Sequence, residues 1–187
     1  VKSSNKEFLK DTSIVIWTTT PWTIPANRAL AFNSNIEYSI LEIDDLEYFK
    51  EKKIVVAKNL IEAITKECEI KNYKEIKTFK GSELTGTICS HPFLKMNYTY
   101  DVPMLDGQFV NLDQGTGIVH CAPSHGADDF NLCLKNNIPS LYTVDNAGLY
   151  TKEIPYFTGT HIFKADPIVI EKLKEHNKLL KNNKLTH

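Results

Sequence analysis

Two short segments concentrate the residue types that could carry out chemistry. The first, from Trp17 to Asn27, reads WTTTPWTIPAN; the second, from Gly115 to Phe130, reads GTGIVHCAPSHGADDF. Each places hydroxyls, ring nitrogens or carboxylates on a turn rich in glycine or proline, just after an apolar run. Loops that leave strand ends are where a rigid scaffold displays binding and catalytic groups. We therefore expect these two segments to build the functional site.

The first segment offers three consecutive hydroxyls, on Thr18, Thr19 and Thr20. Taken alone, such residues are common at strand ends, because threonine favours pleated surfaces. Here they run into a turn that two prolines restrict, so we expect Thr19, Thr20 and Thr23 to lie near one another. A rigid polar rim of this kind can hydrogen-bond a ribose hydroxyl or hold an attacking water.

The second segment combines histidines with carboxylates. Asp128 and Asp129 fall in the first turn of an expected helix, where the helix dipole favours acids. His120 and His125 lie on the same loop, so a carboxylate there could also pair with a substrate ammonium group. Residues 115–117 lack the third glycine and the Lys-Ser/Thr of phosphate-binding loops. We interpret these glycines as backbone freedom around a closely approaching ligand.

Two other chemistries remain as alternatives at this loop. A zinc-dependent hydrolase could use His120, His125 and Asp129, but the spacing is HxxxxH rather than HExxH, and the PCxxC pattern of deaminases is absent, so we expect no metal. Cys121 beside a histidine could be a nucleophile, but no third orienting group accompanies it. We therefore expect Cys121 to be a buried thiol.

Composition limits the class of protein. The chain has 187 residues, of which 42% are hydrophobic, enough for the core of a single domain over residues 1–187. No stretch approaches the roughly 20 apolar residues of a membrane span. The four cysteines form no CxxC pair and no signal peptide is present, which indicates reduced thiols in a cytoplasmic protein. The chain does not begin with methionine, so we expect it to be cut from a longer polypeptide.

The formal net charge of −1 excludes a global field that would attract nucleic acid or anionic lipid. Lysines gather locally, with glutamates and asparagines between them. We interpret them as solvated surface, with a nucleic-acid footprint as the alternative. The two clusters are Lys71, Lys74, Lys77 and Lys80, and Lys172, Lys174, Lys178, Lys181 and Lys184.

Local signals predict an irregular succession of strands and helices. β-Branched and aromatic residues predict strands at 13–20, 28–32 and 38–43, and a strand-rich middle from 74 to 120 with a hairpin at Asp106-Gly107. Short helices are expected at 44–52 and 58–68, on either side of the apolar run 54–57. Because strands and helices do not alternate, we predict an α+β fold with a mostly antiparallel, barrel-like sheet core and peripheral helices.

The second half of the chain carries clearer helix signals. Ser124 can cap a helix over 124–136, with Phe130, Cys133 and Leu134 on one face. A hairpin turn is expected at 145–148. Asp166-Pro167 opens a further helix that continues to Leu180. We expect Ile170, Leu173 and Leu180 on its buried side.

Together the two segments resemble the signature of the editing domain of isoleucyl-tRNA synthetase, an insertion shared by the isoleucyl, valyl and leucyl enzymes. The stretch GTHIFKAD at 159–166 is similar to the family as well, so the resemblance covers nearly the whole chain. The valyl and leucyl relatives usually have arginine where this chain has Thr20, and neither usually has histidine at the place of His120. Both features favour the isoleucyl branch.

The resemblance implies hydrolysis of the ester in mischarged valyl-tRNA(Ile), with isoleucyl-tRNA(Ile) spared. A synthetic pocket gains only about 1–3 kcal/mol from one methylene, a limit for which isoleucyl-tRNA synthetase is itself the standard illustration. The implied partners are the 3′-terminal adenosine of the tRNA and the remainder of the synthetase, with no membrane. No cofactor is implied in this domain, whereas the parent enzyme uses ATP and Mg. The HIGH and KMSKS signatures of the synthetic site are absent.

The resemblance also implies residue roles. Asp129 matches the aspartate that holds the substrate α-ammonium group, and Thr18, Thr19 and Thr20 match the threonines that contact substrate and water. We take Thr19, Thr20 and Asp129 as the catalytic set. The substrate-binding set adds residues that shape the side-chain pocket and an asparagine important for editing: Thr18, Trp22, Thr23, Asn27 and His120.

The family pattern has no obvious general base, and water activation there is attributed to positioning and to the substrate's own ribose hydroxyl. Two departures are visible in this chain. Ile24 stands where leucine is usual, which barely changes the volume, and Cys121 replaces a frequent threonine. A module that binds an aminoacylated 3′ end without cleaving it remains the non-enzymatic alternative.

Overall fold

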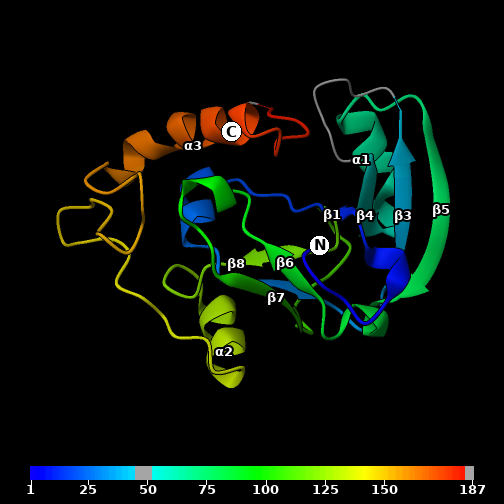
Figure 1. Cartoon of the computed structure of the whole chain (residues 1–187), viewed down its shortest axis with the longest axis horizontal. Helices are drawn as coiled ribbons and strands as arrows, with labels where there is room; N and C mark the ends of the chain where they lie inside the picture. Colours follow the sequence, from blue (N-terminus) through cyan, green and yellow to red (C-terminus); the bar gives the residue numbers. More distant parts are fainter. Residues whose placement is uncertain (45–51, 184–187) are drawn as a thin grey trace.

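The computed structural model describes residues 1–44 and 52–183. A first sheet has the strand order β1-β4-β3-β5 (Figure 1, right). These strands are β1 (Thr12–Ile14), β4 (Lys53–Ala57), β3 (Glu37–Ile43) and β5 (Tyr73–Lys80). The apolar run 54–57 is completely buried and forms the body of β4, next to the centre of the sheet. The pair β1–β4 is parallel, whereas β3 pairs with β4 and β5 in antiparallel fashion.

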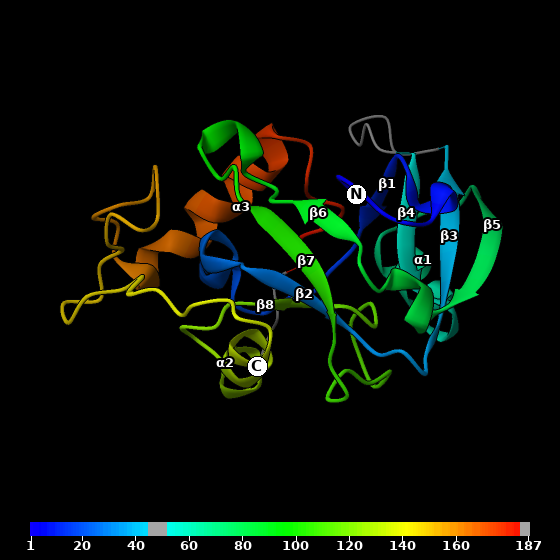
Figure 2. The same cartoon turned by 60° about the horizontal axis from the view of Figure 1, so that its bottom comes forward.

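A second sheet follows the order β6-β7-β2-β8 and lies beside the first (Figure 2). Its strands are β6 (Ile88–Ser90), β7 (Asp101–Asp106), β2 (Ala29–Phe32) and β8 (Val119–Cys121). Strand β2 is buried throughout and pairs in parallel with β7 and antiparallel with β8. The α+β class is therefore confirmed. The barrel-like closure is not, because in the described ranges the strands form two open mixed sheets.

Helices cover the ends and faces of these sheets. They are α1 (Ile61–Glu67), α2 (Ala127–Lys135) and α3 (Ala165–Glu175). Six short 3-10 helices accompany them in the described ranges: η1 (Glu7–Leu9), η2 (Pro21–Ala26), η3 (Lys58–Leu60), η4 (Gly81–Leu84), η5 (Leu94–Met96) and η6 (Ile162–Lys164). Within residues 1–44 and 52–183, no helix is long and apolar enough to cross a membrane.

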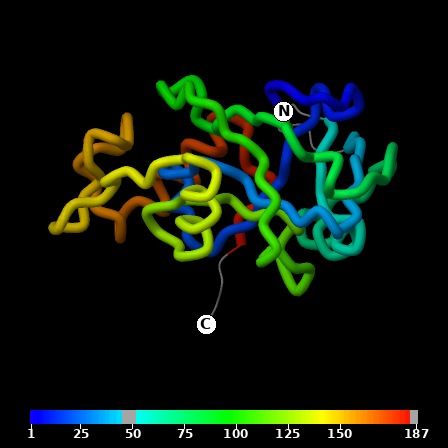
Figure 3. The backbone as a smooth tube through the Cα atoms, turned by 90° about the horizontal axis from the view of Figure 1, so that it is seen from below, coloured from blue at the N-terminus to red at the C-terminus, as the bar shows by residue number. Residues whose placement is uncertain are grey.

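The core consists of several buried clusters. One contains residues of both sheets, including Leu30 and Phe32 of β2 and Tyr38 and Val55 of the first sheet. Another joins α3 to an aromatic group that includes Phe93. We call residues 136–164, between α2 and α3, the connecting segment. It lies at the opposite end of the molecule from β5 (Figure 3, yellow to orange).

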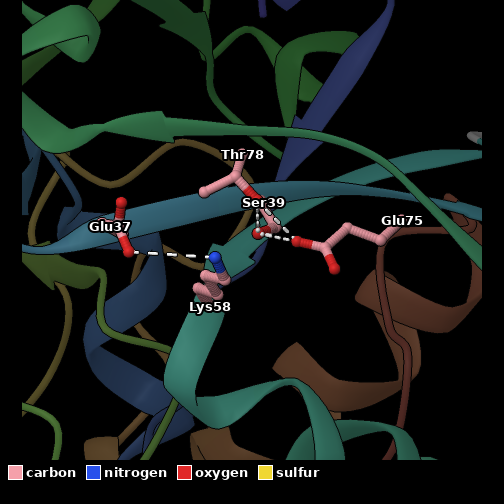
Figure 4. Close-up of polar contacts among 5 residues, drawn as sticks. All are labelled: Glu37, Ser39, Lys58, Glu75 and Thr78. Atoms are coloured by element: carbon pink, nitrogen blue, oxygen red, sulfur yellow. Dashed lines mark hydrogen bonds and ion pairs between the residues drawn. The ribbon is translucent and has the colours of Figure 1, made fainter.

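Edge strand β5 is fastened to β3 by a small polar cluster (Figure 4). The buried hydroxyl of Ser39 donates to Glu75 Oε1 at 2.6 Å, and the Thr78 hydroxyl donates to the same oxygen at 2.7 Å. These hydrogen bonds lower the pKa of Glu75. The strand pairing shifts by one residue between Ile40 and Leu41. The cluster spans this bulge and fixes the lysine-bearing edge strand in place.

Two sequence predictions for strands are wrong. The strand expected at 13–20 ends at Ile14, because beyond the contact of Val15 N–H with Val55 O the chain leaves the sheet toward the proline turn. Asp106-Gly107 does not close a hairpin. Strand β2 lies between β7 and β8, and the Gly107 N–H donates to Phe32 O of β2. Strand β7 therefore pairs with β2, which is distant in sequence and parallel to it, and not with the segment that follows Gly107.

The helix predictions are partly confirmed. Residues 58–67 form η3 and α1, and 145–148 form the expected turn. Helix α2 begins after Gly126, and the Ser124 hydroxyl donates to Leu141 O instead of capping the helix. Phe130 and Leu134 are 42% and 60% exposed, so they do not form the buried face.

Helix α3 starts at Ala165 and ends at Glu175, short of the predicted end at Leu180. Leu173 is buried as expected, whereas Val169 rather than Ile170 completes the buried side. The helix predicted at 44–52 falls on residues 45–51, which lie outside the described residues.

Candidate functional site

A cavity of about 370 Å³ lies where the two motif segments meet. It brings together six of the residues singled out from the sequence. These are Thr18, Thr19, Thr20, Thr23, His120 and Asp129. Residues 18–20 and 120 are a hundred positions apart in the chain, so their convergence is a product of the tertiary fold.

The threonine rim is built by the turn between β1 and η2. The Thr20 N–H donates to Thr18 Oγ1 at 3.0 Å, and the hydroxyls of Thr18 and Thr20 are 3.3 Å apart. The Thr23 hydroxyl donates back to Thr20 O at 2.9 Å. Pro21 opens η2 and presets its backbone. Thr19 and Thr20 remain exposed at the mouth of the cavity, while Thr23 is buried.

His120 lies on strand β8, where it pairs with Leu30 of β2, and its side chain forms part of the cavity wall. Its Nε2 is 3.0 Å from Thr23 Oγ1. When the single Thr23 hydrogen is directed at Thr20 O, Nε2 must carry the proton of the neutral ring and donate to Thr23. Burial, helped by His125, lowers the pKa of His120 to about 4. The wall is therefore a neutral ring held in one orientation.

Asp129 projects from the first turn of α2. Its Oδ2 accepts the Ala122 N–H at 2.9 Å, which ties the helix to the end of β8. A Cβ on Gly126 would lie 2.9 Å from Oδ2, so the glycine provides room for the carboxylate. Burial raises the pKa of Asp129, while the Ala122 N–H opposes this rise. One carboxylate oxygen is thus committed to the backbone, and the other can accept from a cation.

Trp22 and Asn27 lie outside the lining of this cavity. The Trp22 ring packs edge-on against His125, with ring centroids 4.7 Å apart. His125 does line the cavity, and its Nε2 is 2.9 Å from Thr143 Oγ1 of the connecting segment. Sequence reasoning gave His125 no role except as a metal ligand, and Thr143 none at all. Because Thr143 belongs to no motif, only the fold reveals this contact.

A larger cavity of about 980 Å³ lies behind the first. Asn27 lines it, is buried, and accepts the Tyr100 hydroxyl on its main-chain oxygen at 2.9 Å. His120 borders both cavities, together with Trp17, Thr18, Gly115 and Thr116. The smaller cavity holds the convergent hydroxyl, imidazole and carboxylate groups and is the candidate site.

Gly117 of the second segment is required by the packing of the fold, and both Gly115 and Gly117 line the candidate cavity. Gly117 has a φ of +74°, and a Cβ there would lie 2.4 Å from the Cβ of Ala57 in β4. The Ala57 N–H donates to Thr116 O at 2.8 Å, and the Tyr38 hydroxyl donates to Gly117 O at 2.8 Å. The close approach expected of a ligand is made at Gly117 by the first sheet. No local signal announces this, because Ala57 is distant in sequence.

Neither alternative chemistry gains support from the geometry. In residues 1–44 and 52–183, no group of three or more histidine, cysteine or acidic side chains is arranged to hold a metal ion. The Nε2 atoms of His120 and His125 are instead bonded to threonines. Cys121 is buried, and burial raises the pKa of its thiol, which opposes a nucleophilic thiolate.

Residues 9–181 match the family model described as the editing domain of leucyl-tRNA synthetase. The chain belongs to this editing-domain family. It is 63% identical over all 187 residues to the isoleucine–tRNA ligase of Pelagibacter ubique strain HTCC1062, of which it covers 21%. It is 45% identical over 165 residues, 86% of this chain, to the isoleucine–tRNA ligase of Gluconobacter oxydans strain 621H, of which it covers 17%. The editing domain thus spans about a fifth of these relatives' length.

Solved structures agree on the fold of the editing domain. The crystal structure of GlLeuRS-CP1 matches with a TM-score of 0.72 at 15% identity, over 94% of this chain and 85% of the other. The editing domain of P. knowlesi cytosolic leucyl-tRNA synthetase matches with a TM-score of 0.63 at 13% identity, over 89% and 82%. With the isoleucine–tRNA ligase relatives, the resemblance to the isoleucyl-tRNA synthetase editing domain is confirmed.

Proposed function

We propose that this editing domain hydrolyses the ester of valyl-tRNA(Ile) and spares isoleucyl-tRNA(Ile), as part of a longer isoleucine–tRNA ligase. The observation that carries the proposal is the convergence of a threonine rim, a neutral imidazole wall and a half-buried carboxylate in one cavity of about 370 Å³. Each of these groups matches one need of the reaction. The substrate has a cationic amine, a small apolar side chain and an ester that water must attack.

Asp129 binds the α-ammonium group of the amino acid in this mechanism. The oxygen not bonded to Ala122 N–H accepts from the ammonium in a charge-assisted hydrogen bond. Partial burial strengthens this attraction, because the effective dielectric is lower than in water. The amine thereby fixes the ester carbonyl relative to the threonine rim.

Thr19 and Thr20 hold the attacking water and the terminal ribose at the mouth of the cavity. The water oxygen adds to the ester carbonyl carbon, and the bond from that carbon to the ribose oxygen breaks. Valine leaves as the free acid, and the ribose hydroxyl regains a proton that originates from the water. No side chain in the cavity is an evident base, so positioning and the neighbouring ribose hydroxyl supply the activation.

His120 and Thr23 limit the size of the accepted side chain. Attraction alone separates valine from isoleucine poorly, but a close-packed wall turns an extra methylene into overlap. The hydrogen bond between Nε2 and Thr23 holds the ring, so the wall cannot easily yield. Trp22 shapes the site indirectly, by packing against His125 in the cavity wall. Asn27 lines the larger, adjoining cavity and supports the site from there.

The remaining functional assignments are part of the same proposal. The cavity contacts the 3′-terminal adenosine and its amino acid, while the rest of the synthetase delivers the tRNA in a cytoplasmic setting. The domain needs no cofactor of its own; ATP and Mg serve the separate synthetic site.

The decisive experiment measures single-turnover deacylation of valyl-tRNA(Ile) and isoleucyl-tRNA(Ile) by the domain, with and without a zinc chelator. We expect valine to be released and isoleucine to be retained, with no effect of the chelator. Binding of both substrates without hydrolysis would favour the binding module. Loss of activity on chelation, restored by zinc, would favour the metal-dependent hydrolase built on His120, His125 and Asp129.

A further inference from the structure

Trp22 is held by groups that lie far from it in sequence. Its N–H donates to Asp166 Oδ1 of α3 at 2.8 Å, and its carbonyl oxygen accepts the hydroxyl of Tyr150 in the connecting segment. The two contacts span 144 and 128 positions. Figure 1 shows η2 (blue) beneath α3 (orange), in agreement with the contact between Trp22 and Asp166 of α3. Both polar groups of one peptide residue are thus satisfied from outside its own helix.

The held residue lies inside the threonine rim. Trp22 stands between Thr20 and Thr23, and the Thr23 N–H donates to Thr20 O at 3.0 Å. A displacement of the Trp22 backbone therefore displaces the hydroxyls of both threonines and the hydrogen bond to His120. The Trp22 ring also contacts His125 in the cavity wall.

Tyr150 and Asp166, which contact the Trp22 main chain, are themselves fixed by the surrounding structure. Tyr150 is fully buried; its N–H donates to Thr160 O at 3.0 Å, and its carbonyl accepts the Gly159 N–H at 2.8 Å. Asp166 lies in the first turn of α3, which packs its buried side against the aromatic cluster that also contains Tyr150. The two hydrogen bonds therefore connect the Trp22 main chain, and with it the threonine rim, to this packed cluster.

We propose that Asp166 and Tyr150 are positioning residues of the editing site, which clamp the main chain of Trp22 and thereby fix Thr20 and Thr23. This assignment rests on the proposed deacylation. The sequence indicated only that Asp166 begins a helix at the end of a family-like stretch, and it indicated no role for Tyr150. Neither residue lines the catalytic cavity, so their effect on rate passes through the rim.

The test compares variants that differ only in the clamp. Asp166→Ala and Tyr150→Phe remove one contact each, whereas Asp166→Asn keeps an acceptor for the Trp22 N–H. Tyr98→Phe is a matched control from the same aromatic cluster, because its hydroxyl donates to Pro155 O at 2.8 Å rather than to η2, and Tyr98 does not line the cavity. Each variant is assayed for its melting temperature and for the kcat and KM of valyl-tRNA(Ile) deacylation.

We expect Asp166→Ala and Tyr150→Phe to lower kcat about tenfold to a hundredfold, as small misplacements of reacting groups do. Asp166→Asn should stay close to the unsubstituted domain. Tyr98→Phe should lower the melting temperature as much as Tyr150→Phe while its kcat is retained. The clamp is refuted if the two tyrosine variants have equal kcat, or if Asp166→Ala and Asp166→Asn do.

A second readout does not depend on catalysis. The chain has two tryptophans, so a Trp17→Phe background leaves Trp22 as the only indole emitter. In this background, Asp166→Ala and Tyr150→Phe should increase acrylamide quenching of Trp22, and Tyr98→Phe should not. Equal quenching in all variants would overturn the clamp, whether or not the domain cleaves the ester. Absence of ester cleavage by the unsubstituted domain, with the expected differences in quenching, would refute the proposed function but not the clamp.

Discussion

At the residue scale, the proposed mechanism makes His120 the residue that limits the size of the accepted side chain. It borders both cavities, and its ring is neutral because burial lowers its pKa to about 4. His120→Ala removes the ring and joins the site to the space behind it. We therefore expect the variant to hydrolyse isoleucyl-tRNA(Ile), which the unsubstituted domain spares, while valine is still released. Deacylation of both substrates measures this. His161→Ala, outside both cavities, is the control; continued sparing of isoleucine would show that His120 is not the gate.

Asp129 has a structural contact as well as its proposed role, and the two can be separated. Asp129→Asn keeps an oxygen for the Ala122 N–H but removes the charge. Charge-assisted hydrogen bonds contribute about 1.5–3 kcal/mol, so deacylation of valyl-tRNA(Ile) should fall at least about tenfold while the urea midpoint changes little. Asp129→Ala should lose activity and also about 1–2 kcal/mol of unfolding free energy, because the Ala122 N–H loses its partner.

Asp128→Asn is the matched control for Asp129. It stands in the same first turn of α2 but is exposed and does not line the cavity. Its rate should equal that of the unsubstituted domain. If Asp128→Asn and Asp129→Asn have the same rate, the carboxylate of Asp129 acts only through the helix dipole.

The sequence identified most of the cavity-lining candidate residues but not the residues that hold them in place. Thr18–Thr20, Thr23, His120 and Asp129 belong to two compact motifs, so their types and spacing were legible before the fold was known. Asp166 and Tyr150 contact Trp22 across more than a hundred positions, and no local pattern encodes such a contact. The same holds for Ala57, which packs against Gly117 from a strand that is distant in sequence.

At the scale of elements, apolar composition predicted where strands lie but not how they pair. Strands β2, β3 and β5–β8 match the expected regions to within one residue at each end, because β-branched and aromatic residues favour pleated backbone. The Asp106-Gly107 signal failed because β7 pairs with β2 and β6, so β8 is not its neighbour in the sheet. Parallel pairing joins segments that are distant in sequence, so the residues of a local turn cannot predict it.

The contact of the glycine loop with β4 gives an element-scale prediction. Gly117→Ala places a Cβ 2.4 Å from that of Ala57 and also strains a φ of +74°. Gly159→Ala at φ +80° meets nothing within 4 Å, so it isolates the backbone term. We expect Gly159→Ala to cost about 1–2 kcal/mol of unfolding free energy and Gly117→Ala about 1–3 kcal/mol more. Urea titrations measure both; equal costs would mean that β4 yields to the new methyl group.

At the scale of the whole molecule, the distribution of charge determines how strongly the domain should attract the proposed tRNA partner. The net charge is −1, and the lysine clusters are partly neutralised by their neighbours. Lys172 pairs with Glu175, and Lys181 pairs with Glu69. Lys74, Lys77 and Lys80 of the first cluster lie along edge strand β5, where lysines also discourage strand addition from another molecule. Lys184 falls outside the described residues.

We accordingly expect weak binding of uncharged tRNA by this domain, with a shallow dependence on salt. Each phosphate contact made by a lysine makes the slope of log K against log salt concentration more negative by about 0.7–0.9. Filter binding between about 50 and 200 mM salt should therefore give a slope shallower than about −2. A slope steeper than about −4, relieved by Lys74→Glu and Lys77→Glu on β5, would make that edge a nucleic-acid face. Lys6→Glu and Lys10→Glu, two substitutions of the same charge near the N-terminus, are the control for the change in net charge.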